Sequence, residues 1–408
     1  MNDFFQIKEI IKENKKVIIN YECSDTMKKY FCSDMFYAEY DFNIDDLPNS
    51  ILVIPFICNL LPLLWINNVK LVVDEIDKAF IESIQMFKKG YDEMYPEIEF
   101  KEIEIKVKKI INNVQECKNV GTFFSGGIDA FATLFAHIVE MPKLITVWGA
   151  DISTTDFSGW ECTKNNVNKV AQMFELDAQY IKSNFKEMFN TSELNKLIVR
   201  CPDKWWHGFQ HGIGLIGLAA PIAYKFNMKI IYIASSYTKK DKVTCASHPT
   251  IDNFVRFYNT EIIHDQYEFN RQEKIENIVN FTKKVKKFPN IHVCWESSGG
   301  KNCCYCEKCC RTIMGIYAAN GDSSKYGFDA INMKKIKNRM NYLNNIDVTV
   351  TPMWNDIIEY YKKNKEKNEY KEIIEWLEFF KPQKNRTLLK KICRKFEKCK
   401  KLIIKNNI

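Results

Sequence analysis

The first 115 residues alternate between strand-like and helix-like hydrophobic patterns. Two stretches are strand-like, Lys16–Tyr21 and Met35–Phe42, and a third, Glu99–Val107, alternates hydrophobic and polar residues as a half-buried strand does. Hydrophobic residues at helical spacing predict an amphipathic helix over Glu75–Lys89. This segment contains no motif for chemistry, so we interpret residues 1–115 as an accessory α+β domain that contacts substrate or a second copy of the chain.

The longest hydrophobic run, Ile51–Ile66, is predicted to be buried core. It is shorter than the roughly 20 apolar residues that a transmembrane helix needs, and it contains Pro55, Asn59 and Pro62. The N-terminal stretch MNDFFQIKEIIKENKK carries charges throughout and has no continuous apolar region, so we expect no signal peptide.

From about residue 119 onward, short hydrophobic runs alternate with longer amphipathic ones, as in a parallel sheet covered by helices. The predicted strands are Val120–Phe124, Leu144–Trp148, Gln179–Lys182 and Lys229–Ala234. The predicted helices are Asp129–Val139, Thr163–Phe174, Trp205–Phe226 and Arg271–Val285. The pattern predicts a doubly wound α/β domain over residues 116–322, with ligands at the carboxyl ends of its strands.

Residues 323–408 are predicted to be a helical extension, with helices at Met353–Lys365 and Tyr370–Phe380. The net charge of +8 comes from its end, because residues 384–408 carry +9 and the rest of the chain is nearly neutral. Leu388, Ile392 and Phe396 lie on one helical stripe there. We interpret this basic tail as a docked or solvated terminal helix, with contacts to an anionic membrane or to RNA as alternatives.

A glycine-rich junction, Ser125–Asp129 (SGGID), follows a predicted strand and opens a predicted helix. Glycines there let the backbone adopt positive φ and approach a phosphate, while the first N–H groups of the helix attract an anion. Ser125 adds a hydroxyl donor, and Asp129 is a candidate ligand for Mg²⁺. The alternative is a tight turn that needs glycine for steric reasons alone.

The wider stretch FFSGGIDAFATL resembles the SGGxDS signature of the PP-loop ATP pyrophosphatases, in the adenine nucleotide α-hydrolase-like (HUP) superfamily. The resemblance implies binding of ATP with Mg²⁺ and transfer of AMP to a carboxylate or carbonyl oxygen, followed by attack of a nitrogen or sulfur nucleophile. Ala130 replaces the second serine of the signature, so one hydroxyl donor to pyrophosphate is missing.

Residue roles follow from this resemblance. It implies a pyrophosphate loop made of Ser125, Gly126, Gly127, Ile128, Asp129 and Ala130, with catalytic roles for Ser125 and Asp129. It also implies that adenosine lies close to the residues at the end of a neighbouring strand: Val147, Trp148, Gly149 and Asp151.

Six of the fifteen cysteines lie between Cys294 and Cys310, and four of them share a regular spacing. The pattern C-x8-C-x2-C-x2-C consists of Cys294, Cys303, Cys306 and Cys309. Four thiolates at this spacing can surround one Zn²⁺ at Zn–S distances of about 2.3 Å; a [4Fe–4S] cluster is the alternative. The remaining negative charge can be offset by nearby cations: Lys301, Lys308 and Arg311. Cys304 and Cys310 lie outside the spacing.

A PP-loop sequence followed, about 165 residues later, by these cysteines resembles the 7-cyano-7-deazaguanine synthases, the QueC-like branch of the family. The resemblance implies a structural zinc in a knot at residues 294–310, and homodimers are common in that family. Residues 1–115 and the basic tail have no counterpart in the short synthases, so the substrate is expected to differ.

Three further groups are candidates for contacts with nucleotide or substrate. The segment after the strand Lys229–Ala234 offers Ser235, Ser236, Ser247, His248 and Asp252; the alternative is a polar loop in which Asp252 caps a helix. Arg271 and Lys274, one helical turn apart, can meet a phosphate or carboxylate, or simply begin a solvated helix.

The third group lies in the stretch DKWWHGFQH. His207 and His211 have a spacing that suits a metal, but no third ligand is near in sequence, so we interpret them as paired histidines on a helix face. Trp205 or Trp206 can stack on a planar base, although the apolar helix that follows favours packing in the core.

These patterns together predict a cytoplasmic ATP-dependent enzyme with a small-molecule or peptide carboxylate as substrate and ammonia or a sulfur compound as donor. It adenylates a carboxylate or amide oxygen and completes an amidation, a nitrile or a thioamide, in specialised metabolism, protein modification or phage defence. One alternative is sulfuration of tRNA or a nucleobase, for which the basic tail is the only support. Another is a nucleotide-binding regulatory subunit without turnover, motivated by Ala130.

Overall fold

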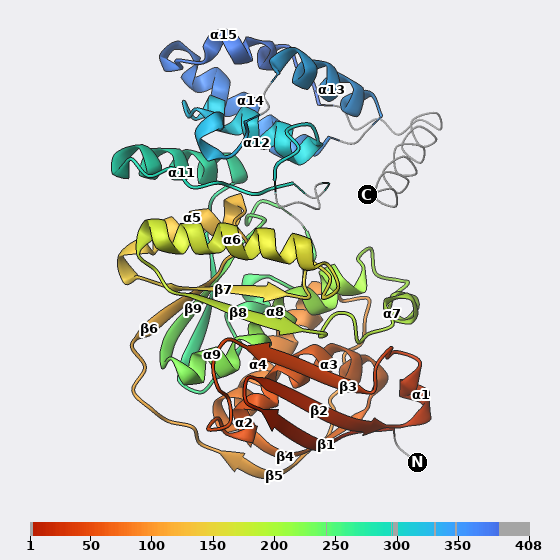
Figure 1. Cartoon of the computed structure of the whole chain (residues 1–408). Helices are drawn as coiled ribbons and strands as arrows, with labels where there is room; N and C mark the ends of the chain where they lie inside the picture. Colours follow the sequence, from red (N-terminus) through yellow and green to blue (C-terminus); the bar gives the residue numbers. More distant parts are fainter. Residues whose placement is uncertain are drawn as a thin grey trace. The chain divides into compact units, whose positions relative to one another are not determined.

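The computed structural model describes residues 3–382, except for 242, 295, 297–300, 330–331 and 347–348. The chain divides into two compact units (Figure 1). Unit 1 comprises Met1–Ser125 and Ala136–Tyr267, and unit 2 comprises Gly126–Phe135 and Glu268–Ile408. These bounds differ from those of the three domains predicted from the sequence. The predicted amphipathic tail lies outside the described residues.

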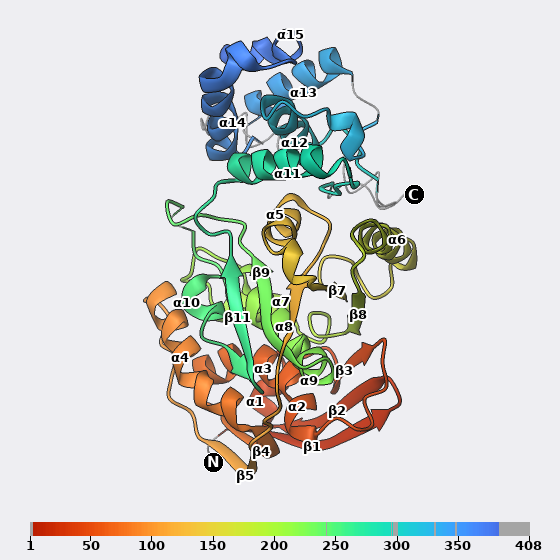
Figure 2. The same ribbon diagram turned by 90° about the vertical axis from the view of Figure 1, so that its left-hand side faces the viewer.

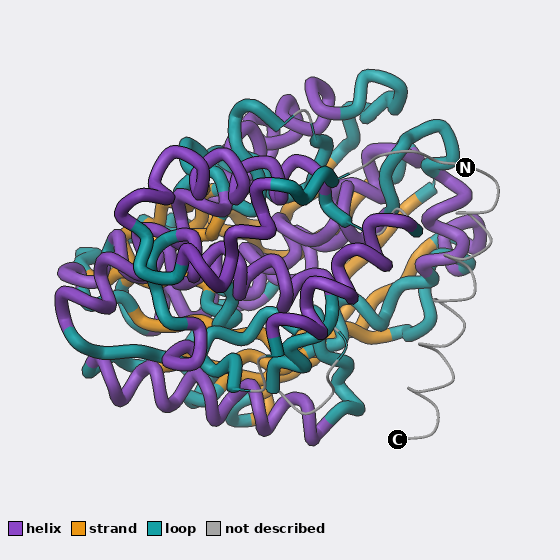
Figure 3. Tube along the Cα trace, turned by 90° about the horizontal axis from the view of Figure 1, so that it is seen from above, coloured by secondary structure: helices purple, strands orange, loops and turns teal. Residues whose placement is uncertain are grey.

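Unit 1 is built on an 11-stranded sheet with the order β10-β11-β9-β6-β7-β8-β3-β2-β1-β4-β5. Its strands are drawn in orange in Figure 3. They are β1 (Phe4–Glu13), β2 (Lys16–Cys23), β3 (Met35–Tyr40), β4 (Lys70–Asp77), β5 (Ile105–Ile111), β6 (Asn119–Phe123), β7 (Lys143–Trp148), β8 (Ala178–Ser183), β9 (Met228–Ala234), β10 (Arg256–Phe257) and β11 (Thr260–Asp265).

The centre of the sheet is parallel, as predicted. Strands β11, β9, β6, β7 and β8 run in the same direction. Strand β3 then pairs with β8 in the antiparallel sense, with Ala38 opposite Ser183, and β2 and β1 continue the sheet. The protein is therefore α/β with a large, mostly parallel sheet, and the strands of the first 115 residues extend that sheet. Strand β1 was not predicted because its charged residues interrupt the alternation.

Helices of unit 1 connect these strands. They are α1 (Asp25–Lys28), α2 (Asn49–Leu52), α3 (Ile54–Asn67), α4 (Lys78–Met94), α6 (Phe157–Phe174), α7 (Thr191–Leu197), α8 (His211–Leu218), α9 (Ala220–Lys225) and α10 (Pro249–Asp252). The hydrophobic run Ile51–Ile66 forms most of α2 and α3 and is almost entirely buried, so its prediction as core is confirmed. Glycines on α8 permit its close packing on α3, because a Cβ at Gly217 would lie 2.6 Å from the Cβ of Cys58.

Two predicted helices of unit 1 differ from the observed ones. The helix predicted over Glu75–Lys89 begins later, because the buried Asp77 ends β4 and caps α4 by accepting a hydrogen bond from Phe80 N at 3.0 Å. The single helix predicted over Trp205–Phe226 is divided into a π-helix at Trp206–Gln210, then α8 and α9. The strand predicted over Glu99–Val107 overlaps β5 only in its last three residues.

The described residues of unit 2 contain helices and no strand (Figure 2). Its helices are α5 (Ile128–Ala136), α11 (Arg271–Val285), α12 (Glu307–Ala318), α13 (Met333–Asn345), α14 (Thr351–Asn364) and α15 (Lys371–Ile374). The bounds of α11 are those predicted, and a capping box between Asn270 and Glu273 explains where it begins. The buried Glu307 joins two helices, since it accepts hydrogen bonds from Arg311 Nε on α12 and Trp354 Nε1 on α14.

No helix of the described residues is long and apolar enough to cross a membrane.

Gly149, directly after β7, provides a test of this sheet. It has φ +112°, and a Cβ there would lie 2.0 Å from the carbonyl oxygen of Ser183 at the end of β8. We expect Gly149→Ala to lower the free energy of unfolding by about 2–4 kcal/mol, measured by urea denaturation, since strain and overlap act together. Gly126→Ala is the control: its φ is +77° but no atom lies within 4 Å of the added Cβ. Equal losses in the two variants would contradict the steric argument.

Candidate functional sites

The glycine-rich loop joins the end of β6 to the beginning of α5. Gly126 has φ +77°, and a side chain there would meet no atom within 4 Å, so glycine is needed for the backbone conformation rather than for space. The carbonyl oxygen of Gly126 accepts a hydrogen bond from His292 N at 2.9 Å. Ser125 is exposed and Ala130 is buried. The loop is therefore held on the segment that leads to Cys294.

The first turn of α5 carries an ion cluster. Asp129 Oδ2 lies 2.8 Å from Arg271 Nη1, and Asp129 Oδ1 lies 3.8 Å from Lys274 Nζ. Only 9% of the Arg271 side chain and 1% of the Lys274 side chain are exposed. The structure thus brings together three predicted site residues that are about 140 positions apart in sequence, and it rejects the interpretation of Arg271 and Lys274 as a solvated helix start.

Charge determines how this cluster behaves. Burial by itself raises the pKa of Asp129, but the positive charges of Arg271, Lys274 and Lys308 outweigh burial and leave that pKa lowered. The carboxylate is therefore ionised, and the cluster keeps an excess of positive charge. A Mg²⁺ ion bound directly to Asp129 does not fit, because two cationic side chains already occupy its surroundings. The arrangement suits an anion instead.

The residues predicted to contact adenosine, together with the nucleotide or substrate candidates Ser235 and Ser236, belong to unit 1. Trp148 stacks on Trp160 with ring centroids 5.2 Å apart, and its Nε1 donates to Ser153 O at 2.7 Å. Ser235 is buried and Ser236 is exposed, at the end of β9. The environment of Trp148 is thus one of packing, and Gly149 has the steric role described above.

His248 and Asp252 also lie in unit 1, but their roles are reversed relative to the capping interpretation. His248 is the residue that caps α10, and its Nε2 lies 2.9 Å from the Tyr267 hydroxyl. Asp252 is fully buried, and its Oδ2 accepts from Ser247 Oγ and His264 Nδ1, both at 2.8 Å. The alternative in which Asp252 caps a helix is wrong, because the buried carboxylate accepts a hydrogen bond from His264.

His207 and His211 are not equivalent partners. His207 Nδ1 lies 2.8 Å from Asp203 Oδ1, whereas His211 packs edge-on against Trp206 at 5.2 Å. Burial lowers the pKa of His211. Sequence reasoning passed over Asp203, although its position four residues before His207 is the signal that could have found it.

The four predicted cysteines form one cluster in unit 2. The Sγ atoms of Cys294, Cys303, Cys306 and Cys309 all lie within 4.8 Å of one another. Two of the separations are 3.9 Å, between Cys294 and Cys306, and 4.0 Å, between Cys303 and Cys309. Four sulfur atoms this close together form a site that could hold a metal ion such as zinc.

Backbone N–H groups donate hydrogen bonds to two of the cysteine sulfurs. Cys303 Sγ accepts hydrogen bonds from Tyr305 N at 3.4 Å and Cys306 N at 3.2 Å. Cys306 caps α12 and accepts from Cys309 N at 3.4 Å, so two of the sulfurs lie at a helix N-terminus, where negative charge is favoured. These contacts all stabilise thiolates, the form that binds metal.

Two residues next to the four cysteines, Arg311 and Cys310, do not take part in the metal site. Arg311 was predicted to offset the charge of the thiolates, but it is paired with Glu307 instead, because two buried opposite charges one helical turn apart satisfy each other. Cys310 is buried, and burial raises the pKa of its thiol to about 12, as expected for a cysteine outside the metal set.

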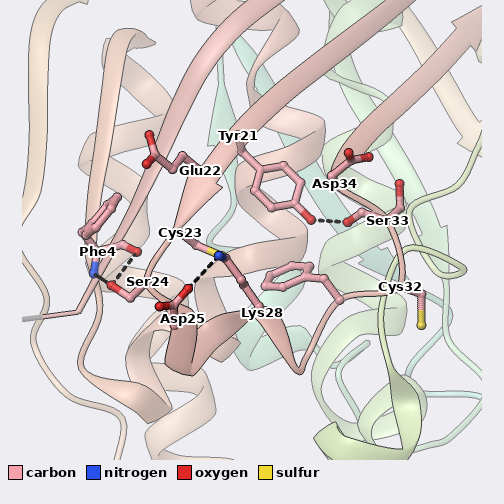
Figure 4. Close-up of a pocket in the computed structure, with 11 residues that line it drawn as sticks. Phe4, Tyr21, Glu22, Cys23, Ser24, Asp25, Lys28, Cys32, Ser33 and Asp34 are labelled. Atoms are coloured by element: carbon pink, nitrogen blue, oxygen red, sulfur yellow. Dashed lines mark hydrogen bonds and ion pairs between the residues drawn. The ribbon is translucent and has the colours of Figure 1, made fainter.

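A separate pocket of about 690 Å³ lies in unit 1, lined by residues of β1, β2, α1 and the segment before β3 (Figure 4). Two pairs of its polar groups contact each other: the Tyr21 hydroxyl donates to the carbonyl oxygen of Ser33, and Lys28 lies 2.6 Å from Asp25. Burial raises the pKa of the Cys23 thiol. The lining contains no histidine, and its chemistry does not identify a ligand.

No family model matches the chain, and neither the curated proteins nor the solved structures contain a match.

The metal cluster gives a direct prediction. The purified chain should bind about one equivalent of zinc, and Cys306→Ser should lose it, because a structural site needs all four ligands. Removal of the metal with a chelator should lower the temperature of thermal unfolding, since metal binding contributes to folding free energy. Metal content is measured by inductively coupled plasma mass spectrometry.

Cys304→Ser and Cys310→Ser are matched controls, because both cysteines lie next to the cluster but outside it. Both variants should keep the metal. Loss of zinc from either, or its retention in Cys306→Ser, would show that the ligand set is wrong.

Proposed function

We propose that the protein is an ATP-dependent adenylating enzyme of the PP-loop, QueC-like type, and that unit 2 binds the pyrophosphate part of ATP. The observation that carries the proposal is the pairing of Asp129 with Arg271 and Lys274 at the first turn of α5, directly after the glycine loop. The resemblance of FFSGGIDAFATL to the PP-loop signature supports the same assignment.

The cluster has unused capacity for an anion. Arg271 Nε is buried and has no hydrogen-bond partner, so one guanidinium donor remains for a ligand oxygen. Asp129 neutralises one of the two positive charges and holds Arg271 in place, and the first N–H groups of α5 add donors. Phosphate oxygens match this combination of fixed guanidinium, ammonium and backbone N–H groups.

The proposed reaction follows from these donors. A substrate carboxylate or amide oxygen attacks the α-phosphorus of ATP, an oxygen–phosphorus bond forms, and the bond to the β-phosphate breaks. Arg271, Lys274 and the loop N–H groups receive the negative charge that develops on the departing pyrophosphate. Ammonia or a sulfur nucleophile then displaces AMP from the activated carbon. Magnesium enters with the phosphates of ATP, since Asp129 is already paired.

We assign zinc rather than a [4Fe–4S] cluster to the cysteines. Four ligands about 2.3 Å from one tetrahedral ion are separated by about 3.8 Å, and the sulfurs here approach at 3.9 and 4.0 Å. A cubane cluster binds each cysteine through a different iron, which requires wider separation. Zinc fixes the segment whose His292 N–H holds the carbonyl group of Gly126. It thereby keeps the loop in shape.

Thiolate ligands require a reducing compartment, so we place this activity in the cytoplasm. The methyl group of Ala130 is buried and neither adds nor removes a phosphate donor, so the backbone donors of the loop are retained. Sulfuration of tRNA rests on the basic tail, which lies outside the described residues. The acceptor is therefore proposed as a carboxylate of a small molecule or a peptide.

Binding of phosphate groups is the first test. Isothermal titration with ATP and with inorganic pyrophosphate should show binding to the wild-type protein. Arg271→Met should weaken both affinities by at least about tenfold, because a charged hydrogen bond is lost. Lys284→Met, an exposed cation on the same helix, is the control and should change neither. Equal effects of the two variants would exclude the proposed site.

Turnover is the second test. The enzyme, mixed with ATP and a pool of carboxylate substrates, should yield AMP and pyrophosphate. Chromatography of the nucleotides measures the rate of AMP formation. Ala130→Ser should increase that rate by up to about tenfold, since it restores a hydroxyl donor that is worth roughly 1–2 kcal/mol. ADP and orthophosphate as products would contradict adenylation. Activity that appears only in Ala130→Ser would favour the regulatory subunit.

A further inference from the structure

Unit 1 contains an arrangement of thiol, imidazole and carboxylate that the adenylation reaction does not use. Asp203 precedes the π-helix at Trp206–Gln210, and His207 lies within it. The imidazole Nδ1 of His207 lies 2.8 and 3.0 Å from the two carboxylate oxygens of Asp203. A histidine held in this way has a fixed tautomer and a fixed ring orientation.

The carboxylate is itself held firmly. Asp203 accepts hydrogen bonds from the Tyr95 hydroxyl at 3.1 Å and from Lys204 N at 2.7 Å. Gly208 makes room for it, because a Cβ there would lie 2.8 Å from Asp203 Oδ2 and 2.7 Å from the Tyr95 hydroxyl. Three elements of the chain therefore converge on one carboxylate whose only cationic neighbour at hydrogen-bond distance, among the described residues, is His207.

Cys245 completes the group. Thr244, directly before it, donates from its hydroxyl to Asp203 Oδ2 at 3.4 Å, and the Cys245 thiol contributes, after Asp203, to the raised pKa of His207. The neighbouring Ala246 N donates to the carbonyl oxygen of His207 at 2.9 Å, which fixes the cysteine segment against the π-helix. The backbone N–H of Ser247 donates to Cys245 Sγ at 3.4 Å and fixes the position of the sulfur.

Hydrogen bonds to Asp203 and Cys245 raise the pKa of His207 to about 10, so the imidazole is protonated at neutral pH. Burial raises the pKa of Asp203, but the hydrogen bonds from His207 outweigh it, and that pKa is lowered. Carboxylate, imidazolium and thiol are thus aligned in charge as well as in space. A π-helix at this position agrees with a functional role, since such distortions of a helix occur frequently at functional sites.

We propose that Cys245, His207 and Asp203 form a nucleophile, a proton donor and an orienting carboxylate that transfer acyl groups from small carboxylic esters, thioesters or amides. The Cys245 residue is 5% exposed, while 41% of the His207 side chain is open to solvent, so a substrate enters from the histidine side. The arrangement follows the logic of cysteine and serine acyl-transfer sites, which are recognised by geometry and not by the order of residues.

The proposed step conserves atoms and electrons. Cys245 first loses its thiol proton to solvent. Its thiolate attacks the acyl carbon, the sulfur–carbon bond forms, and the bond from carbon to the leaving oxygen, sulfur or nitrogen breaks while the His207 imidazolium gives a proton to the leaving group. Water or an amine then attacks the thioester, the neutral His207 takes the proton from this nucleophile, and the thiolate is released together with a carboxylic acid or an amide. No oxidant or reductant is required.

Other titratable groups face the same space and must be considered in a pH profile. Tyr91 on α4 and Tyr95, directly after this helix, interact electrostatically with Cys245, and burial raises the pKa of both hydroxyl groups. The pKa of His211, at the start of α8, is lowered by burial; the charges of Asp151 and Asp252 oppose this effect, and the charge of His207 adds to it. These tyrosines are neutral over the range in which a thiol titrates, so changes in reactivity report Cys245 and His207.

The test uses the full chain with 4-nitrophenyl acetate as the acyl donor. The wild-type protein should release a burst of about one equivalent of 4-nitrophenolate, and peptide mass spectrometry should find the acetyl group on Cys245. Cys245→Ala should abolish the burst. His207→Gln should slow acylation by about 100-fold or more, because proton transfer to the leaving group is lost. The difference in rate between the two proteins should be present at neutral pH, where the wild-type imidazole is protonated.

Cys32, exposed elsewhere in unit 1, is the internal control. Its slow acetylation should be the same in all variants, and Cys32→Ala should keep the burst. Asp203→Asn tests the orienting role and should resemble His207→Gln if the circular dichroism spectrum shows that it is folded. Acetylation of Cys245 no faster than that of Cys32, or independent of His207, would overturn the proposal. This assay contains no ATP, so its result is separate from that of the adenylation reaction.

Discussion

Largely buried carboxylates that require a positive partner determine two of the candidate sites, at Asp129 and at Asp203. A carboxylate cannot remain ionised inside a protein unless a cation or several donors compensate it. Asp129 meets this condition with Arg271 and Lys274. Asp203 meets it with His207 and the Tyr95 hydroxyl. In each case the pairing fixes a group that chemistry can use: a guanidinium with an unused donor in unit 2, and an oriented imidazole in unit 1.

Small residues and caps make these pairings possible. Gly208 leaves space for the carboxylate of Asp203, and Gly217 allows α8 to pack closely on α3. In unit 2 the capping box of α11 fixes the point at which Arg271 enters the helix, and Cys306 caps α12 with a sulfur of the metal cluster. Local hydrogen bonds at helix ends therefore set the position of functional side chains, since each cap determines where its helix begins.

Features with a local signature could be predicted from the sequence. The parallel strands β6 to β9 follow from short hydrophobic runs, and α11 follows from helical spacing with its cap. Features that depend on distant partners could not. Strand β1 has charged residues that hide its alternation, and it is a strand because β2 and β4 pair with it on both sides. Asp252 looks like a helix cap in sequence, yet His264 requires its carboxylate.

The sequence by itself determined the glycine loop, the positions of the central strands along the chain and the spacing of the four cysteines, because each depends on residues that are close along the chain. Only the tertiary structure decided which charges meet. Arg271 and Lys274 lie about 140 residues from Asp129, and Cys245 lies nearly 40 residues from His207. Nothing in their local sequence specifies these partners. Electrostatic interactions depend on distance in space and on burial, and both are set only when the sheet and its helices have packed.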